Sequence, residues 1–304
     1  MSNTFKKISS ANGAILQCGR FKLKLARPLI MGILNVTPDS FSDGGCFVNY
    51  NTAYARAHQM IDEGADIIDI GGESTRPGAP LVTLDKELER VLFLIEKLLN
   101  AGVPISIDTY KPQVMRAALN VGVDFINDIR GLRQPGALDA VRDTFCGLCV
   151  VHMQGAPSTM QHKPQYHDIS ANVRDFLNER ICSLEQAGIA SNRLCVDPGF
   201  GFGKTAQHNF TLLRELPRAI PTGVPTLVGL SRKSMIGAAT GRRVPKQRIA
   251  GSLAGMLAAI DRGAAIVRVH DVAPTVDALK VWQAINGRPW YHAQSMHVMS
   301  NNKL

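Results

Sequence analysis

Eight short apolar runs rich in valine and isoleucine alternate with stretches of helical periodicity, and this alternation limits the possible folds more than any other feature. The runs cover residues 29–36, 66–70, 104–108, 125–129, 148–153, 194–197, 226–230 and 265–270. Most are nearly continuous in apolar character, as strands are when helices cover a parallel sheet on both faces. The sequence therefore predicts an α/β protein with a parallel sheet.

The stretches between these runs predict helices at residues 54–63, 84–100, 112–120, 135–143, 169–186, 209–215, 247–262 and 274–286. Five helices are followed, just before the next strand, by a glycine that can take the left-handed conformation of a helix end: Gly64, Gly102, Gly122, Gly188 and Gly263. Eight such units favour a closed (β/α)8 TIM barrel in a single domain. A doubly wound open sheet shares the local pattern and is the alternative.

The barrel is expected to span residues 28–286, preceded by a lead-in segment (1–27) and followed by a polar C-terminal tail (287–304). No stretch resembles a signal peptide core or approaches the roughly 18 apolar residues of a membrane span. The six cysteines are scattered, and Cys146-x-x-Cys149 runs into apolar residues rather than into a helix. We therefore expect a cytoplasmic protein without disulfides and without a membrane partner.

The formal net charge of +9 raises the question of a nucleic-acid partner. Lysine and arginine are dispersed, however, and no basic stretch is interleaved with aromatic residues. No nucleic-acid partner is expected. An anionic small substrate and a plain basic surface both remain compatible with the charge.

Polar residues close most of the apolar runs, and in a barrel the carboxyl ends of the strands build the active site. For any one of these residues a loop-capping hydrogen bond is the alternative role, but together they predict a single site. The residues are Asn35, Asp108, Asn127, Asp128, His152, Asp197, Ser231, Arg232, Lys233, Arg268 and His270.

Two kinds of chemistry are expected within this set. Arg268 and His270 lie two apart in one strand and share a face, so with Lys233 they form a basic corner suited to a phosphate group. Salt bridges to loop carboxylates would be the alternative. Asp108, Asn127 and Asp197 lie deeper, where a flat heterocycle with N–H and amino donors would satisfy them. An internal network with Lys233 is compatible with that role.

Three loops are rich in glycine. Residues 37–45 and 71–78 are long enough to close over a substrate, which would bring Asp43 and Arg76 to it. Residues 197–204 fit neither a dinucleotide-binding nor a P-loop spacing, and we expect Phe202 to line a pocket there. The histidines lack metal-binding spacing, whereas Asn35 beside a diphosphate would suffice for Mg²⁺.

Taken together, residues 35–45, 71–78, 127–129, 197–204, 231–234 and 268–271 resemble the dihydropteroate synthase family of pterin-binding TIM barrels. The resemblance extends from about residue 28 to about residue 284. It implies a folate-biosynthesis transferase that condenses 6-hydroxymethyl-7,8-dihydropterin diphosphate with p-aminobenzoate, forming 7,8-dihydropteroate and diphosphate. It also implies a Mg²⁺ cofactor, a homodimer packed through outer helices, and sensitivity to sulfonamides.

The resemblance also assigns roles to individual residues. The pterin would be held by Asp108, Asn127, Asp197 and Lys233. The diphosphate would be held by Asn35, Arg268 and His270, with magnesium at Asn35. The p-aminobenzoate pocket would include Phe41, Thr75, Pro77, Phe202 and Ser234. The catalytic set would be Asp43, Arg76, Lys233, Arg268 and His270.

In the mechanism that we expect, the diphosphate leaves first and the amine then attacks the pterin methylene cation. Basic groups would stabilise the charge that develops on the leaving group. A methyltetrahydrofolate-dependent methyltransferase is the nearest rival, because it shares the deep Asp and Asn sites but needs no diphosphate corner. A barrel that binds a phosphorylated metabolite or a partner without catalysis is a second rival.

Overall fold

The computed structural model describes residues 14–36, 46–74, 81–155 and 159–287. Its main sheet has eight parallel strands in the order β8-β7-β6-β5-β4-β3-β10-β9. A parallel bridge between Val196 and Thr226 joins β8 to the segment before β9. This bridge brings the two sheet edges together, so the closed barrel is confirmed over the open sheet. The strands are β3 (Leu29–Asn35), β4 (Ile67–Gly71), β5 (Ile105–Asp108), β6 (Phe125–Asp128), β7 (Gly147–Val151), β8 (Leu194–Asp197), β9 (Leu227–Val228) and β10 (Ile266–Val269).

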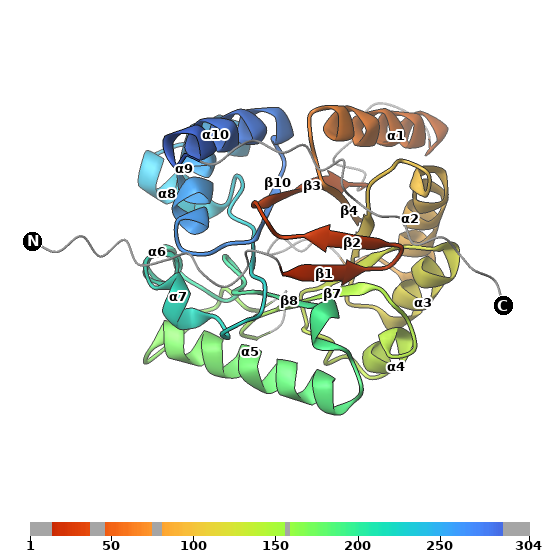
Figure 1. Ribbon diagram of the computed structural model, residues 1–304, viewed down its shortest axis with the longest axis horizontal. Helices are drawn as coiled ribbons and strands as arrows, with labels where there is room; N and C mark the ends of the chain where they lie inside the picture. The colour runs from red at the N-terminus through yellow and green to blue at the C-terminus, as the bar shows by residue number, and fades with distance from the viewer. Residues whose placement is uncertain (1–13, 37–45, 75–80, 156–158, 288–304) are drawn as a thin grey trace, which may run out of the picture.

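Helices surround the barrel (Figure 1) and cover the outer faces of the strands. They are α1 (Cys46–Asp62), α2 (Leu84–Leu98), α3 (Pro112–Val121), α4 (Ala137–Val141), α5 (Ile169–Gln186), α6 (Ala206–Arg214), α7 (Leu216–Ala219), α8 (Ser234–Thr240), α9 (Ile249–Ile260) and α10 (Val272–Ile285). The 3-10 turns η2 (Ser191–Arg193) and η3 (Pro245–Arg248) precede β8 and α9. The helix α8 was not expected, because its seven residues are too few to show a helical period. The five glycines predicted to follow helices all have positive φ, between +80° and +118°.

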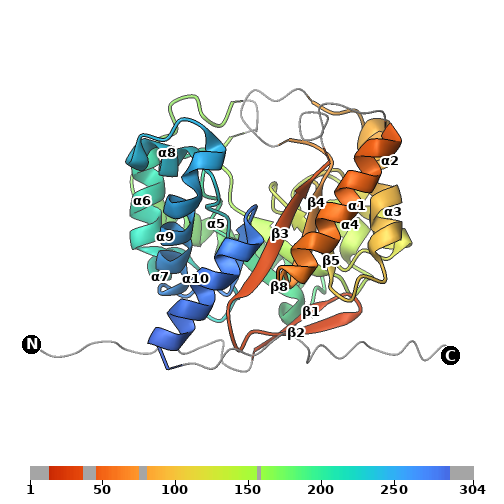
Figure 2. The same ribbon diagram turned by 90° about the horizontal axis from the view of Figure 1, so that it is seen from above.

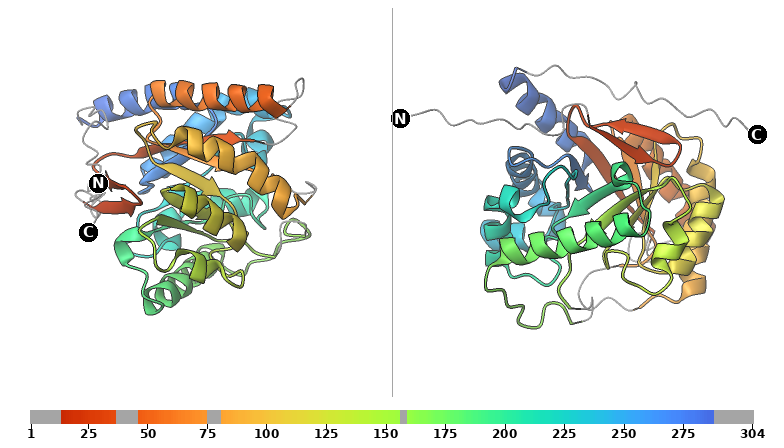
Figure 3. Two further views of the ribbon diagram at one scale, coloured as in Figure 1. Left: turned by 90° about the vertical axis from the view of Figure 1, so that its right-hand side faces the viewer. Right: turned by 60° about the horizontal axis from the view of Figure 1, so that its bottom comes forward.

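An antiparallel hairpin closes the end of the barrel at which the strands begin (Figures 2 and 3). It consists of β1 (Ile15–Cys18) and β2 (Phe21–Lys24), which lie in the segment to which the sequence assigned no role. Leu16 and Leu23 are fully buried in a cluster with barrel residues such as Met31 and Phe125. Arg20 fixes the turn, since its Nη2 lies 2.8 Å from Oδ2 of the buried Asp124.

We expect Leu23→Ala to lower the free energy of unfolding by about 2–5 kcal/mol, because a buried leucine leaves a cavity when it is truncated. Leu81→Ala is the matched control, since Leu81 is 80% exposed. Its effect should stay within about 0.5 kcal/mol. Urea unfolding of both variants measures the difference, and equal unfolding midpoints would show that the hairpin does not contribute to the barrel core.

The carboxyl ends of the strands lie at the end of the barrel opposite the hairpin (Figure 2). The helices in the described part of the chain include none with the length and apolar character needed to cross a membrane.

Candidate active site

Charged side chains from three strands meet inside the open end of the barrel. Arg268 of β10 donates from Nε to Oδ2 of Asp69 at 2.6 Å and from Nη2 to Oδ2 of Asp108 at 2.7 Å. It therefore bridges two carboxylates on β4 and β5, which lie on the far side of β3 in the sheet order. Arg268 therefore holds an internal network with Asp69 and Asp108, and Lys233 interacts electrostatically with Asp197 and Asp108 beside it.

Asp69 is the residue that the sequence reasoning missed. It lies within the apolar run 66–70 rather than at its end, and its side chain is fully buried. Its Oδ1 accepts a hydrogen bond from Oγ of Ser106 at 2.5 Å, and its Oδ2 accepts one from Nδ2 of Asn127 at 3.3 Å. A carboxylate in an otherwise apolar strand must have buried partners, and that requirement is the signal that could have identified it.

Two neighbouring oxygens at this site have no hydrogen-bond partner among the described residues: Oδ1 of Asp108 and Oδ1 of Asn127. The two residues are paired in register on β5 and β6. Burial raises the pKa of Asp108 to about 7, although Arg268 lowers it. Buried acceptors without donors are costly, so the pair favours a ligand that presents donors.

Asp197 and Lys233 lie against the same space. Oδ1 of Asp197 accepts from the backbone N–H of Gly199 at 2.7 Å, and burial raises the pKa of this carboxyl. Burial lowers the pKa of Lys233 to about 8, and its Nζ donates to the backbone carbonyl of Phe200. A Cβ added to Gly229 would lie 4.0 Å from both Oδ2 of Asp197 and Nζ of Lys233. Both groups therefore lie close to the backbone of Gly229.

The glycine-rich segment after β8 is folded around its own lysine. Nζ of the buried Lys204 lies 2.8 Å from the carbonyl of Gly199, 3.1 Å from that of Phe202 and 2.8 Å from Nδ1 of His152. A Cβ on Gly199, whose φ is +71°, would lie 1.7 Å from the carbonyl oxygen of His152. Lys204 is thus bound to the carbonyl groups of its own loop. This agrees with the sequence, in which the glycine spacing does not match a phosphate-binding loop. The segment places the ring of Phe202 under Nζ of Lys233, which lies 4.7 Å from the ring centroid.

Some strand-end residues in the predicted set have structural partners. Asp128 accepts the backbone N–H groups of Arg130 and Leu132, which is the loop-capping alternative. His152 is buried against Lys204. Arg232 forms an ion pair with Asp271.

The remaining predicted residues lie nearer the rim. His270 contacts Oγ of Ser231 through Nδ1 at 3.0 Å. Ser234 is the first residue of α8. A Cβ on Gly71 would lie 3.3 Å from Oδ1 of Asn35 and 3.9 Å from Cβ of Asp108. Asn35 and Asp108 therefore lie on either side of Gly71. Five predicted residues lie outside the described residues: Phe41, Asp43, Thr75, Arg76 and Pro77.

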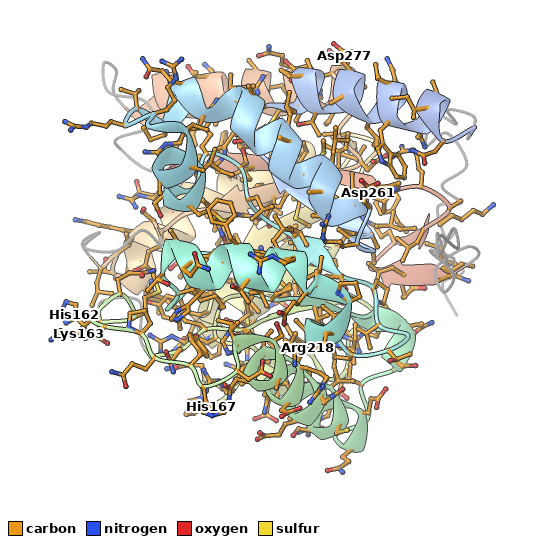
Figure 4. All side chains as sticks on the ribbon, turned by 90° about the vertical axis from the view of Figure 1, so that its left-hand side faces the viewer. His162, Lys163, His167, Arg218, Asp261 and Asp277 are labelled. Atoms are coloured by element: carbon orange, nitrogen blue, oxygen red, sulfur yellow. The ribbon has the colours of Figure 1, made fainter. Side chains whose placement is uncertain are left out.

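The described residues contain no group of three His, Cys, Asp or Glu side chains that could hold a metal ion. Figure 4 shows His162 and His167 at the periphery of the molecule, and both are exposed.

Comparisons with known proteins agree with this geometry. Residues 31–270 match the family model for pterin binding enzymes. A dihydropteroate synthase from Neisseria meningitidis serogroup C is 50% identical over 275 residues, which are 89% of this chain and 97% of that protein. The dihydropteroate synthase structure from Burkholderia cenocepacia, complexed with 7,8-dihydropteroate, is 57% identical with a TM-score of 0.83 and covers 90% of this chain and 97% of that one. The Xanthomonas albilineans enzyme with 4-aminobenzoic acid is 53% identical with a TM-score of 0.85 and covers 91% and 100%.

Proposed function

Because the chain belongs to the dihydropteroate synthase family of pterin-binding enzymes, we propose that it condenses 6-hydroxymethyl-7,8-dihydropterin diphosphate with p-aminobenzoate. The products are 7,8-dihydropteroate and diphosphate, and the chain is a transferase of folate biosynthesis. One observation carries the proposal: Asp108 and Asn127 are paired in register, and Oδ1 of each is buried without a donor among the described residues. A pterin ring supplies N–H and amino donors in one plane.

The pterin ring occupies the space bordered by Asp108, Asn127, Asp197 and Lys233. The two unpartnered acceptors and the carboxylate of Asp197 receive the ring donors, and the ammonium of Lys233 donates to a ring acceptor. Because these groups are already buried, the ring is recognised without a large cost of desolvating the protein on binding. A ring that lacks donors would leave two acceptors buried and unpaired.

The diphosphate is held by Asn35, Arg268 and His270. Arg268 is shared with Asp69 and Asp108, so its charge is partly offset before the substrate binds. Together with Lys233, these groups stabilise the negative charge that develops on the departing oxygen. The bond between the methylene carbon and the bridging oxygen breaks, and its electron pair leaves with the diphosphate.

The methylene carbon is then cationic, and the electron-rich pterin ring spreads its charge. The nitrogen lone pair of p-aminobenzoate forms the new C–N bond, and the amine loses a proton to solvent. Phe202 and Ser234 line the amine pocket, with Phe41, Thr75 and Pro77 on the two loops. Asp43 and Arg76 act when these loops close, which excludes water from the cation.

A magnesium ion fits the donor set at the barrel mouth. Asn35 offers an amide oxygen, and Mg²⁺ is commonly held by one or two protein oxygens plus substrate phosphates. The ion would neutralise charge on the diphosphate when it is bound.

We also propose that the protein is a cytoplasmic homodimer that packs through its outer helices. An apolar groove between α9 and α10 is lined by Leu253, Leu257, Val281 and Ile285, and the last two are 60% and 79% exposed. Light scattering after gel filtration tests the dimer, and Val281→Glu should shift it towards the monomer.

Incubation of the purified chain with the pterin diphosphate and radiolabelled p-aminobenzoate tests the proposal. Labelled dihydropteroate that depends on both substrates is the expected product. A methyltransferase would instead bind methyltetrahydrofolate and form no labelled product, and a barrel without catalysis would bind the pterin diphosphate but leave it intact.

The dependence of kcat/KM on pH is expected to be bell-shaped. Activity should rise as Asp108 ionises, because the ring donors need a carboxylate, and should fall as Lys233 loses its proton. The pKa values of about 7 and about 8 place the maximum between these limbs. In Lys233→Arg the alkaline limb should move beyond pH 10, since arginine stays protonated. An unchanged alkaline limb would assign it to another group.

A further inference from the structure

We propose that Asp69 is a positioning residue of the pterin site, which fixes the orientation of Asn127 and Arg268 and so keeps the pocket able to accept hydrogen bonds. The inference rests on the proposed function, because Asn127 and Arg268 are assigned to the substrate there. Asp69 itself is fully buried in β4 and acts through these neighbours.

Three donors converge on the carboxylate of Asp69. Its Oδ2 accepts from Nε of Arg268 and from Nδ2 of Asn127, and its Oδ1 accepts from Oγ of Ser106. Carboxylate oxygens accept hydrogen bonds, and each of these neighbours turns a donor towards them. Asp69 therefore determines the direction of all three side chains.

The consequence is largest for Asn127, because its amide has a donor end and an acceptor end. With Nδ2 held by Asp69, the Oδ1 end is turned away, and it is buried without a partner among the described residues. Oδ1 of Asp108, on the adjoining strand, is likewise buried without a hydrogen-bond partner among the described residues. Asp108 and Asn127, paired in register on β5 and β6, thus each present an acceptor oxygen without a partner among the described residues.

Asp69→Leu would remove this control while keeping the branched shape of the side chain. Both carboxylate oxygens become methyl groups, which cannot accept a hydrogen bond from Asn127. Asn127 is then free to turn its amide by half a revolution and to place its NH₂ beside the unpartnered oxygen of Asp108. Such an internal hydrogen bond would consume the acceptors that the pterin needs, although every pterin-contacting residue would still be present.

The experiment compares the full-length wild type and Asp69→Leu. Calorimetric titration with 6-hydroxymethyl-7,8-dihydropterin in the presence of inorganic diphosphate gives the Kd. We expect the Kd, and the KM for the pterin diphosphate, to rise at least tenfold. The KM for p-aminobenzoate at saturating pterin diphosphate should stay within twofold, because Asp69 does not act on the amine pocket.

A double-mutant comparison separates positioning from a general structural effect. In an Asn127→Ala background there is no amide to turn, so Asp69→Leu should raise the Kd by no more than about threefold. Asp128→Leu is the matched control: it also removes a buried carboxylate beside Asn127, but one that accepts the backbone N–H groups of Arg130 and Leu132. Its Kd for the dihydropterin should stay within twofold of the wild type.

A wild-type Kd in Asp69→Leu, or the same loss in the Asn127→Ala background, would overturn the inference. If Asp69→Leu does not fold, Ser106→Ala replaces it, since it removes one of the three partners that hold the carboxylate. That variant should raise the Kd about threefold, and an unchanged Kd would likewise overturn the inference. A wild type that neither binds the dihydropterin nor forms dihydropteroate would instead refute the proposed function.

Discussion

Lys233→Ala is expected to lower kcat/KM for the pterin diphosphate by about 10²–10³-fold, the usual effect of removing one donor that stabilises charge in a transition state. The Nζ of Lys233 lies beside both Asp197 and the ring of Phe202, so its loss affects ring recognition and leaving-group departure together. Steady-state kinetics with both substrates varied measure the change.

The fold should survive this substitution. Burial lowers the pKa of Lys233, so its charge is unfavourable to the folded state in the absence of substrate. The melting temperature of Lys233→Ala should therefore equal or exceed that of the wild type. Lys246→Ala, at an exposed lysine in η3, is the control and should keep its kcat/KM within twofold. Near-wild-type turnover in Lys233→Ala would remove this residue from the catalytic set.

Arg268→Ala is expected to abolish activity and to destabilise the protein by about 3–5 kcal/mol, because it leaves buried carboxylates without their cation. The two carboxylates are Asp69 and Asp108, whose side chains are 0% and 10% exposed. Arg218→Ala is the matched control, since its ion pairs with Asp168 and Glu215 lie on the surface (Figure 4). Its loss of stability should be much smaller.

The loss of unfolding free energy in Arg268→Ala should depend on pH. The pKa of Asp108 is already raised to about 7, above the value of about 3.9 in an unfolded chain, and removal of Arg268 raises it further. A group whose pKa is raised by folding favours the folded state at low pH, and this contribution is lost as pH rises through the folded-state pKa. The deficit relative to wild type should therefore be larger at pH 8.5 than at pH 6. Urea unfolding at the two pH values measures it, and a deficit independent of pH would contradict the assigned charge pairing.

The barrel could be predicted from local patterns. Continuous apolar runs identified the strands, and glycines such as Gly64 marked the helix ends. The hairpin at residues 15–24 could not be predicted as part of the barrel, because its leucines are buried by strands that lie far along the chain. Similarly, α8 is too short to show a period.

The sequence could predict that certain strand-end residues share one end of the barrel, but not how they pair. The rule that strand ends build the site identified Asp108, Asn127 and Asp197, which do lie at one barrel end. It could not show that Arg268 reaches across the barrel to Asp108, because that contact joins residues 160 positions apart. Asp69 was missed because it lies in the middle of β4 (Ile67–Gly71), whereas the rule concerns residues at the ends of strands.

The most direct test of the proposed function measures both products in one reaction of the wild-type chain with the pterin diphosphate, p-aminobenzoate and Mg²⁺. Carrying ¹⁸O in the oxygen that bridges carbon and phosphorus, the substrate reports which bond breaks. Our account predicts dihydropteroate and diphosphate in a one-to-one ratio, with the label in the diphosphate. Absence of dihydropteroate, or diphosphate released without it, would contradict that account.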